Sequence, residues 1–73
     1  MEKEVEKEKN INMINFEGEY LNGERNGKGV EYYSKSSDIK FEGEYLNGKR
    51  NGKGIEYINY YAYECEYLDG KRI

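Results

Sequence analysis

The sequence predicts an all-β protein in which consecutive antiparallel β-hairpins form an elongated, single-layer, twisted sheet. Three observations lead to this fold class: an internal repeat, alternation of residue types within it, and Asn-Gly pairs between the alternating runs. The segment FEGEYLNGERNGKGVEY at residues 16–32 returns as FEGEYLNGKRNGKGIEY at 41–57, and a shorter copy, YECEYLDGKR, follows at 63–72. The copies start 25 and then 22 residues apart, and a period in this range is typical of repeat arrays.

Each full copy reads as one hairpin. Residues 16–20 alternate aromatic or small residues with glutamate, which is the period of a strand with one buried and one solvated face. Asn-Gly pairs at 22–23 and 26–27 favour turns, so we expect a loop of about six residues before a second strand at 29–32. The expected structural positions are Phe16, Gly18, Tyr20, Gly23, Gly29 and Tyr32, repeated as Phe41, Gly43, Tyr45, Gly48, Gly54 and Tyr57.

Glycine at strand positions needs a reason, because it weakens a strand. Gly18 lies between Phe16 and Tyr20 on the face expected to be buried. We expect the aromatic rings of one hairpin to stack over the glycines of the next hairpin.

The segment before the first copy divides into two parts. Residues 1–10, MEKEVEKEKN, would place like charges four residues apart in a helix, which is unfavourable, so we expect a mostly disordered, charged, flexible arm. Residues 11–15 are expected to form a lead-in strand, or the remnant of an earlier repeat, that covers the first edge. The repeat domain then spans 11–73, with repeat 1 at 16–33, repeat 2 at 41–58 and partial repeat 3 at 63–73.

The third copy departs from the pattern. Cys65 stands where the earlier copies have glycine, and Asp69 replaces asparagine in the turn. The sequence stops at Ile73, so we expect the returning strand to be absent. An open strand edge is a template for association. Three explanations remain open: a fragment of a longer chain, completion by another molecule, or a cap on repeat 2.

These residues carry a family resemblance. Aromatic-x-Gly-x-aromatic-x-Asn-Gly-x-x-x-Gly-x-Gly, present in both full copies, closely resembles the MORN repeat (membrane occupation and recognition nexus). The resemblance covers 16–33, 41–58 and 63–72. It implies stacked antiparallel hairpins and roles in scaffolding, self-association or contact with anionic lipids. MORN repeats are also attached to lipid kinases and protein methyltransferases, so a targeting segment of a larger enzyme is a further hypothesis.

Composition argues against catalysis and cofactors. The 73 residues include no His and one Cys, which excludes His-based triads and thiolate zinc clusters, and we expect no enzyme activity, no metal and no cofactor. Glu64 and Glu66 beside Cys65 should raise the pKa of its thiol. The net charge of −3 argues against nucleic-acid binding. We expect a cytoplasmic protein, peripheral to a membrane under the lipid hypothesis.

Two residue sets remain as candidates for binding. A protein or self-association interface is expected at tyrosines near the open edge, namely Tyr60, Tyr61, Tyr63 and Tyr67. An anionic phospholipid surface such as phosphoinositides is the alternative, contacted by the loop cations Arg25, Lys28, Lys49, Arg50, Lys53, Lys71 and Arg72. The repeated glutamate pairs are interpreted as a solvated sheet face.

Overall fold

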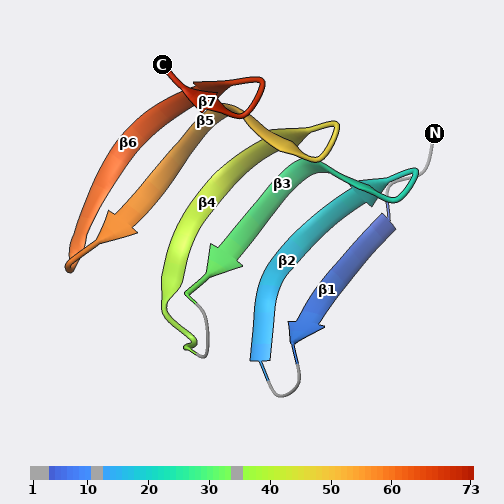
Figure 1. The fold of residues 1–73 in the computed structure, drawn as a ribbon, viewed down its shortest axis with the longest axis horizontal. Helices are drawn as coiled ribbons and strands as arrows, with labels where there is room; N and C mark the ends of the chain where they lie inside the picture. Colours follow the sequence, from blue (N-terminus) through green and yellow to red (C-terminus); the bar gives the residue numbers. More distant parts are fainter. Residues whose placement is uncertain (1–3, 11–12, 34–35) are drawn as a thin grey trace.

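The protein is a single antiparallel β-sheet. The computed structural model describes residues 4–10, 13–33 and 36–73, and their side chains from Asn15 onward. In these described residues, seven strands follow one another in chain order across the sheet (Figure 1). They are β1 (Glu4–Asn10), β2 (Met13–Leu21), β3 (Glu24–Tyr32), β4 (Ile39–Leu46), β5 (Lys49–Ile58), β6 (Tyr61–Leu68) and β7 (Lys71–Arg72). The molecule measures 38 × 33 × 14 Å, which confirms a sheet one layer thick.

The turns are shorter than the sequence suggested. The β2–β3 turn consists of Asn22 and Gly23 alone, with positive φ angles of 52° and 82°, and the β4–β5 turn repeats this conformation at Asn47 and Gly48. Two successive positive φ angles are typical of the tight hairpin turn that matches strand twist. The predicted six-residue loop is therefore wrong: the first Asn-Gly pair makes the turn, and the second belongs to the following strand.

The second Asn-Gly pair forms a β-bulge. Between Gly18 and Tyr20 the register of β2 against β3 shifts, so that Gly18 faces Gly29 whereas Tyr20 faces Arg25. Gly27 has a φ of 102° there, a conformation that glycine adopts without steric cost. Because bulges bend a strand and increase its twist, this shift, repeated between β4 and β5, accounts for the arched strands in Figure 1.

The core is a zigzag of aromatic rings on one face, which we call the aromatic face. Its buried side chains are Phe16, Tyr20, Phe41, Tyr45 and Tyr67. Neighbouring rings meet edge to face, with centroids 5.2 Å apart for Phe16 and Tyr45 and 5.6 Å apart for Phe41 and Tyr67. This geometry suits the charge distribution of aromatic rings, and it links each hairpin to the next.

The glycines lie beneath these rings, as predicted, but mostly under the ring of their own hairpin. A Cβ atom built on Gly18 would lie 2.8 Å from Cζ of Phe16 and 2.7 Å from the Cα of Gly29. The following hairpin contributes Tyr45, whose Cε1 would lie 3.1 Å from a Cβ on Gly29. Close approach of ring and backbone therefore explains glycine at these positions.

The N-terminal segment lies along the edge of the first hairpin. Residues 4–10 form β1, which pairs antiparallel with β2 and places Lys7 opposite Glu17. Residues four apart are about 6 Å from each other in a helix but about 13 Å from each other along a strand, so repulsion between like charges is weaker in the strand, and the edge of β2 supplies backbone partners. Within the expected lead-in segment, residues 13–15 form the beginning of β2 and continue into repeat 1. Residues 1–3 and 11–12 lie outside the described residues.

The returning strand that was expected to be absent from the last unit is present in a short form, β7. β7 pairs with β6 only at Tyr67 and Leu68, and the backbone N–H of Ile73 donates to the carbonyl of Glu66 at 2.9 Å. Among the described residues, the outer edge of β6 from Tyr61 to Cys65 has no strand beside it. The expected open edge is therefore present in this chain.

Candidate functional site

The β5–β6 turn presents an exposed apolar cluster, which we call the aromatic tip. It consists of Ile58, Tyr60, Tyr61 and Tyr63, which are 42%, 108%, 66% and 45% exposed. Tyr61 and Tyr63 lie on the same face of β6, with ring centroids 6.4 Å apart. Three of the four predicted interface tyrosines therefore lie together at one end of one hairpin.

The backbone of the aromatic tip is strained. Asn59 and Tyr60 form the turn, with φ angles of 50° and 71°. Asparagine tolerates the left-handed conformation, whereas for a bulky residue it is an outlier that costs about 1–2 kcal/mol. The equivalent position is glycine in the turns at 22–23, 47–48 and 69–70. The fold thus holds a large, fully solvated ring where a smaller residue would be more stable.

Tyr67 does not belong to this cluster. Its ring packs on Phe41 in the core and is 8% exposed. It occupies the position that Tyr20 and Tyr45 hold in the earlier copies, and this equivalence was the sequence signal for a core position. Tyr33 was not predicted as an interface residue, although it is 39% exposed and its hydroxyl donates to the carbonyl of Tyr57 near the tip.

Two of the predicted loop cations stabilise the core instead. The guanidinium carbons of Arg25 and Arg50 each lie 3.9 Å from a ring centroid, over Phe16 and Phe41 respectively. Arg50 also donates two hydrogen bonds of 2.9 Å to Glu31 and one of 2.8 Å to the Tyr67 hydroxyl. A stacked, bidentate arginine of this kind is a structural group.

The carboxylate of Glu31 is the centre of this network. It also accepts a hydrogen bond from the Tyr45 hydroxyl. Burial raises the pKa of Glu31, but the hydrogen bonds from Arg50 and Tyr45 outweigh it, and the pKa lies below its ordinary value of 4.5. Burial and the same carboxylate raise the pKa of Tyr45. Glu31 was not among the residues predicted from the sequence, although Glu56 repeats it in the next copy.

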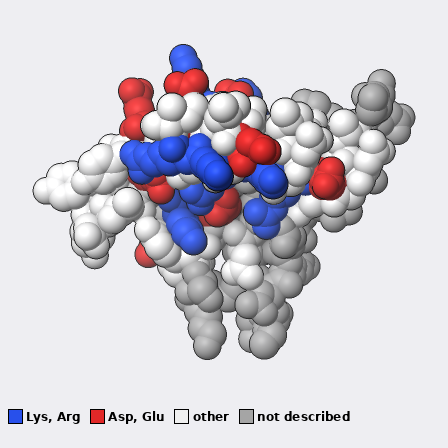
Figure 2. Space-filling view, turned by 45° about the horizontal axis from the view of Figure 1, so that its top comes forward, with Lys and Arg blue, Asp and Glu red and all other residues white. Residues whose placement is uncertain are grey.

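The remaining cations are divided between several places. Arg72 pairs with Glu56, and Lys49 lies 3.6 Å from Asp69. Lys28 and Lys53 lie on the face opposite the aromatic rings, where they are register neighbours of Glu44 and Glu66. Figure 2 shows blue side chains gathered at the end of the tight turns with red ones among them. The seven cations therefore do not form one continuous row.

Cys65 packs beside the aromatic core and is half-buried. Its pKa is raised, as predicted, but the cause differs: burial comes first and the Glu56 carboxylate second, rather than Glu64 and Glu66. The described residues contain no group of three potential metal ligands. Within that part of the chain, no helix is long and apolar enough to cross a bilayer.

Comparison with known proteins agrees with this architecture. The model of the MORN repeat matches residues 16–37 and 41–59, which together exceed half of the chain. No curated protein and no solved structure matches the chain. Each matched segment contains one hairpin with its tight Asn-Gly turn, its bulge and its ring-covered glycines. The chain therefore belongs to the MORN repeat family.

Proposed function

We propose that the chain is a non-catalytic protein-binding module that contacts a protein partner or a second copy of itself through the aromatic tip. The main observation behind this proposal is that the ring of Tyr60 is fully exposed although its backbone has a left-handed conformation. Strain of this kind is a reason to look for function. Tyrosine is also enriched among the residues that dominate binding energy at interfaces.

The neighbourhood of the tip supports this proposal. Ile58, Tyr61 and Tyr63 extend the apolar surface around Tyr60. The open edge of β6 begins at Tyr61, so backbone hydrogen-bonding groups lie next to the rings. A partner that contacts the rings can add a strand to this edge, a recurrent mode of recognition in which the main chain provides affinity.

Sedimentation velocity at several concentrations tests self-association first. We expect the wild-type chain to associate as concentration rises, and the pair Tyr60→Ser and Tyr61→Ser to abolish this. Leu68→Ser is the matched control, because Leu68 is 63% exposed at the opposite end of β6. A chain that stays monomeric throughout, with no change in the tyrosine variant, would exclude self-association.

Anionic-lipid binding is a second candidate, favoured by the exposed lysines Lys49 and Lys71 beside the β4–β5 and β6–β7 turns. The proximity of Asp69 to Lys49 weakens this candidate. Flotation with phosphoinositide vesicles tests it, using Lys49→Glu with Lys71→Glu. Arg50 is unsuitable for this test because its loss would disturb the core. Binding unchanged by the two substitutions, or absent at low salt, would contradict it.

A further inference from the structure

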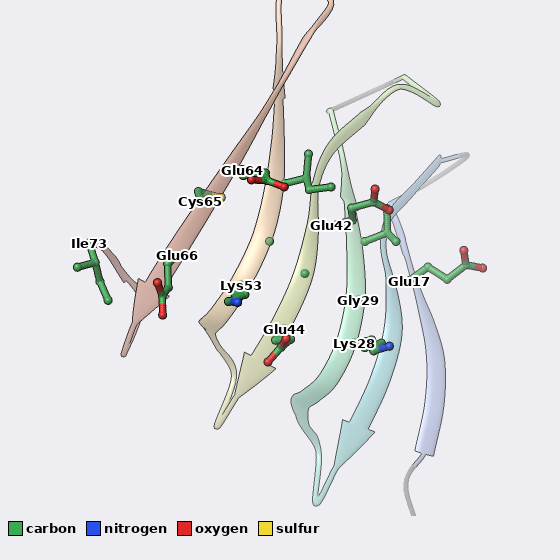
Figure 3. A pocket seen from close by; sticks show the side chains of 14 residues that line it. Glu17, Lys28, Gly29, Glu42, Glu44, Lys53, Glu64, Cys65, Glu66 and Ile73 are labelled. Atoms are coloured by element: carbon green, nitrogen blue, oxygen red, sulfur yellow. The ribbon is translucent and has the colours of Figure 1, made fainter.

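A groove crosses the sheet on the face opposite the aromatic rings. Its volume is about 880 Å³, and its lining includes five glutamates and two lysines from strands β2 to β6. The backbone of Gly29, Gly43 and Gly54 forms part of the lining, and the bulges that follow Gly18 and Gly43 bend the strands at this level. Figure 3 shows the acidic and basic side chains along the two sides of the glycine positions.

One side of the groove alternates acid and aliphatic residues from strand to strand. The register aligns Glu17, Val30, Glu42, Ile55 and Glu64 across β2 to β6. Val30 and Ile55 are half-buried, so each presents part of an apolar side chain between two carboxylates. Since neighbouring strands lie about 4.8 Å apart, like residues in this row recur about every 10 Å.

The other side of the groove is close to neutral. The register places Lys28 opposite Glu44, and Lys53 opposite Glu66. Each lysine can therefore offset the carboxylate beside it. The excess negative charge of the groove therefore lies on the side that contains Glu17, Glu42 and Glu64.

Within the row of Glu17, Glu42 and Glu64, the proposed binding depends on Glu42 and Glu64. Glu42 accepts a hydrogen bond from the Tyr57 hydroxyl, a neutral donor that leaves its charge in place, and Glu64 is exposed. Neither has a cationic partner in the described part of the chain. Glu17 is not counted with these two carboxylates, because Lys7 is its register partner on β1.

We infer that this groove binds a protein segment in polyproline II conformation that carries arginine or lysine at every third position with aliphatic residues between. A polyproline II chain has three residues per turn and advances about 9 Å per turn, so cations at every third position share one face of the chain and match successive glutamates of the row. The aliphatic residues meet Val30 and Ile55. Electrostatic complementarity of this kind sets register and specificity.

Fluorescence anisotropy with a labelled peptide of about nine residues tests the inference. Arginine occupies every third position of the peptide, valine follows each arginine, and alanine fills the rest. We expect it to bind at low salt and to bind more weakly as salt rises, because salt screens exposed charges. A peptide of the same composition with arginine at every fourth position, and one with glutamate in place of arginine, should both bind more weakly.

The double substitution Glu42→Gln and Glu64→Gln should lower the affinity for the peptide by about fivefold to tenfold, which corresponds to the loss of two exposed ion pairs. Glutamine keeps an oxygen that accepts from Tyr57, and thermal melting monitors the fold. The matched control is Glu24→Gln with Asp69→Asn, which removes the same charge at the turns. Asparagine is the residue that the first two copies have at the position of Asp69.

Three results would overturn the inference: no binding, equal weakening by both charge-removing pairs, or equal binding of the peptide with four-residue spacing. Replacing Tyr60 and Tyr61 by serine should leave peptide affinity unchanged, because neither residue lines the groove. The groove and the aromatic tip are thus tested independently, and failure of one leaves the other standing.

Discussion

Replacing Gly43 by alanine tests whether close approach of ring and backbone sets the identity of the glycines. The added Cβ would lie 2.7 Å from the Cα of Gly54, 2.7 Å from Cζ of Phe41 and 2.8 Å from the carbonyl oxygen of Lys53. Two of these neighbours are backbone atoms, so β4 and β5 must separate or the buried Phe41 ring must move. Real Cβ atoms essentially never show such distances, and the side chain therefore cannot be accommodated without a shift.

The expected cost follows from two opposing effects. Overpacking in a well-packed core costs about 1–3 kcal/mol, whereas alanine gains about 0.4–1 kcal/mol by restricting the unfolded chain. With the displacement of Phe41, which is 1% exposed, we expect a net loss of about 2 kcal/mol. Domains of this size have free energies of unfolding of about 4–11 kcal/mol, so the melting temperature should fall by about 8–16 °C.

Chemical denaturation and thermal melting measure the loss, and Cys65→Ala is the matched control. Cys65 occupies the equivalent position of repeat 3 and already has a Cβ, so alanine there should change stability by less than about 1 kcal/mol. Gly43→Ala should cost less in a Phe41→Leu background than in the wild type, because the shorter side chain vacates the contact. Equal effects at Gly43 and Cys65 would refute the reasoning.

Three further outcomes are expected. Arg50→Lys should lower the free energy of unfolding by about 2 kcal/mol in urea titration, because lysine cannot form the bidentate bond to Glu31; an unchanged midpoint would contradict the network. Tyr60→Gly should raise the free energy of unfolding by about 1 kcal/mol by relieving the left-handed strain, and a lower melting temperature would argue against that strain. Because the folded pKa of Glu31 is below 4.5, its ionisation stabilises the fold above that pH, and this contribution disappears as pH falls through the folded pKa. Urea titrations from pH 7 downward should show the stability gap between wild type and Glu31→Gln closing in acid, whereas a constant gap would show that Glu31 is not linked to protonation.

The hairpins could be predicted because their signals are local. Alternation at residues 16–20 and the pair Asn22-Gly23 specify a strand and a turn without information from elsewhere in the chain. The pair Asn26-Gly27 carries the same local signal, yet Gly27 serves a bulge inside β3. Which pair turns the chain depends on cross-strand register, and a local pattern does not contain it.

The candidate site depended more on tertiary contacts. The exposure of Tyr60 and Tyr61 agrees with the surplus of aromatic residues in so small a core, whereas Tyr67 is buried because Phe41 and Arg50 lie beside it. Arg50 was predicted as a loop cation because its charge suggested solvent. Its role follows from Glu31, which lies 19 residues earlier in the sequence and reaches Arg50 only after β3, β4 and β5 have paired.

The contacts of Arg50 have a consequence for cutting or extending the chain. This side chain belongs to the second copy, yet it binds a carboxylate of the first and a hydroxyl of the third. A break between copies would leave Glu31 and Arg50 in separate pieces and abolish their bidentate ion pair. The smallest piece with complete contacts is therefore offset from the sequence period, and an engineered concatemer should be joined so that every Glu31–Arg50–Tyr67 triad remains intact.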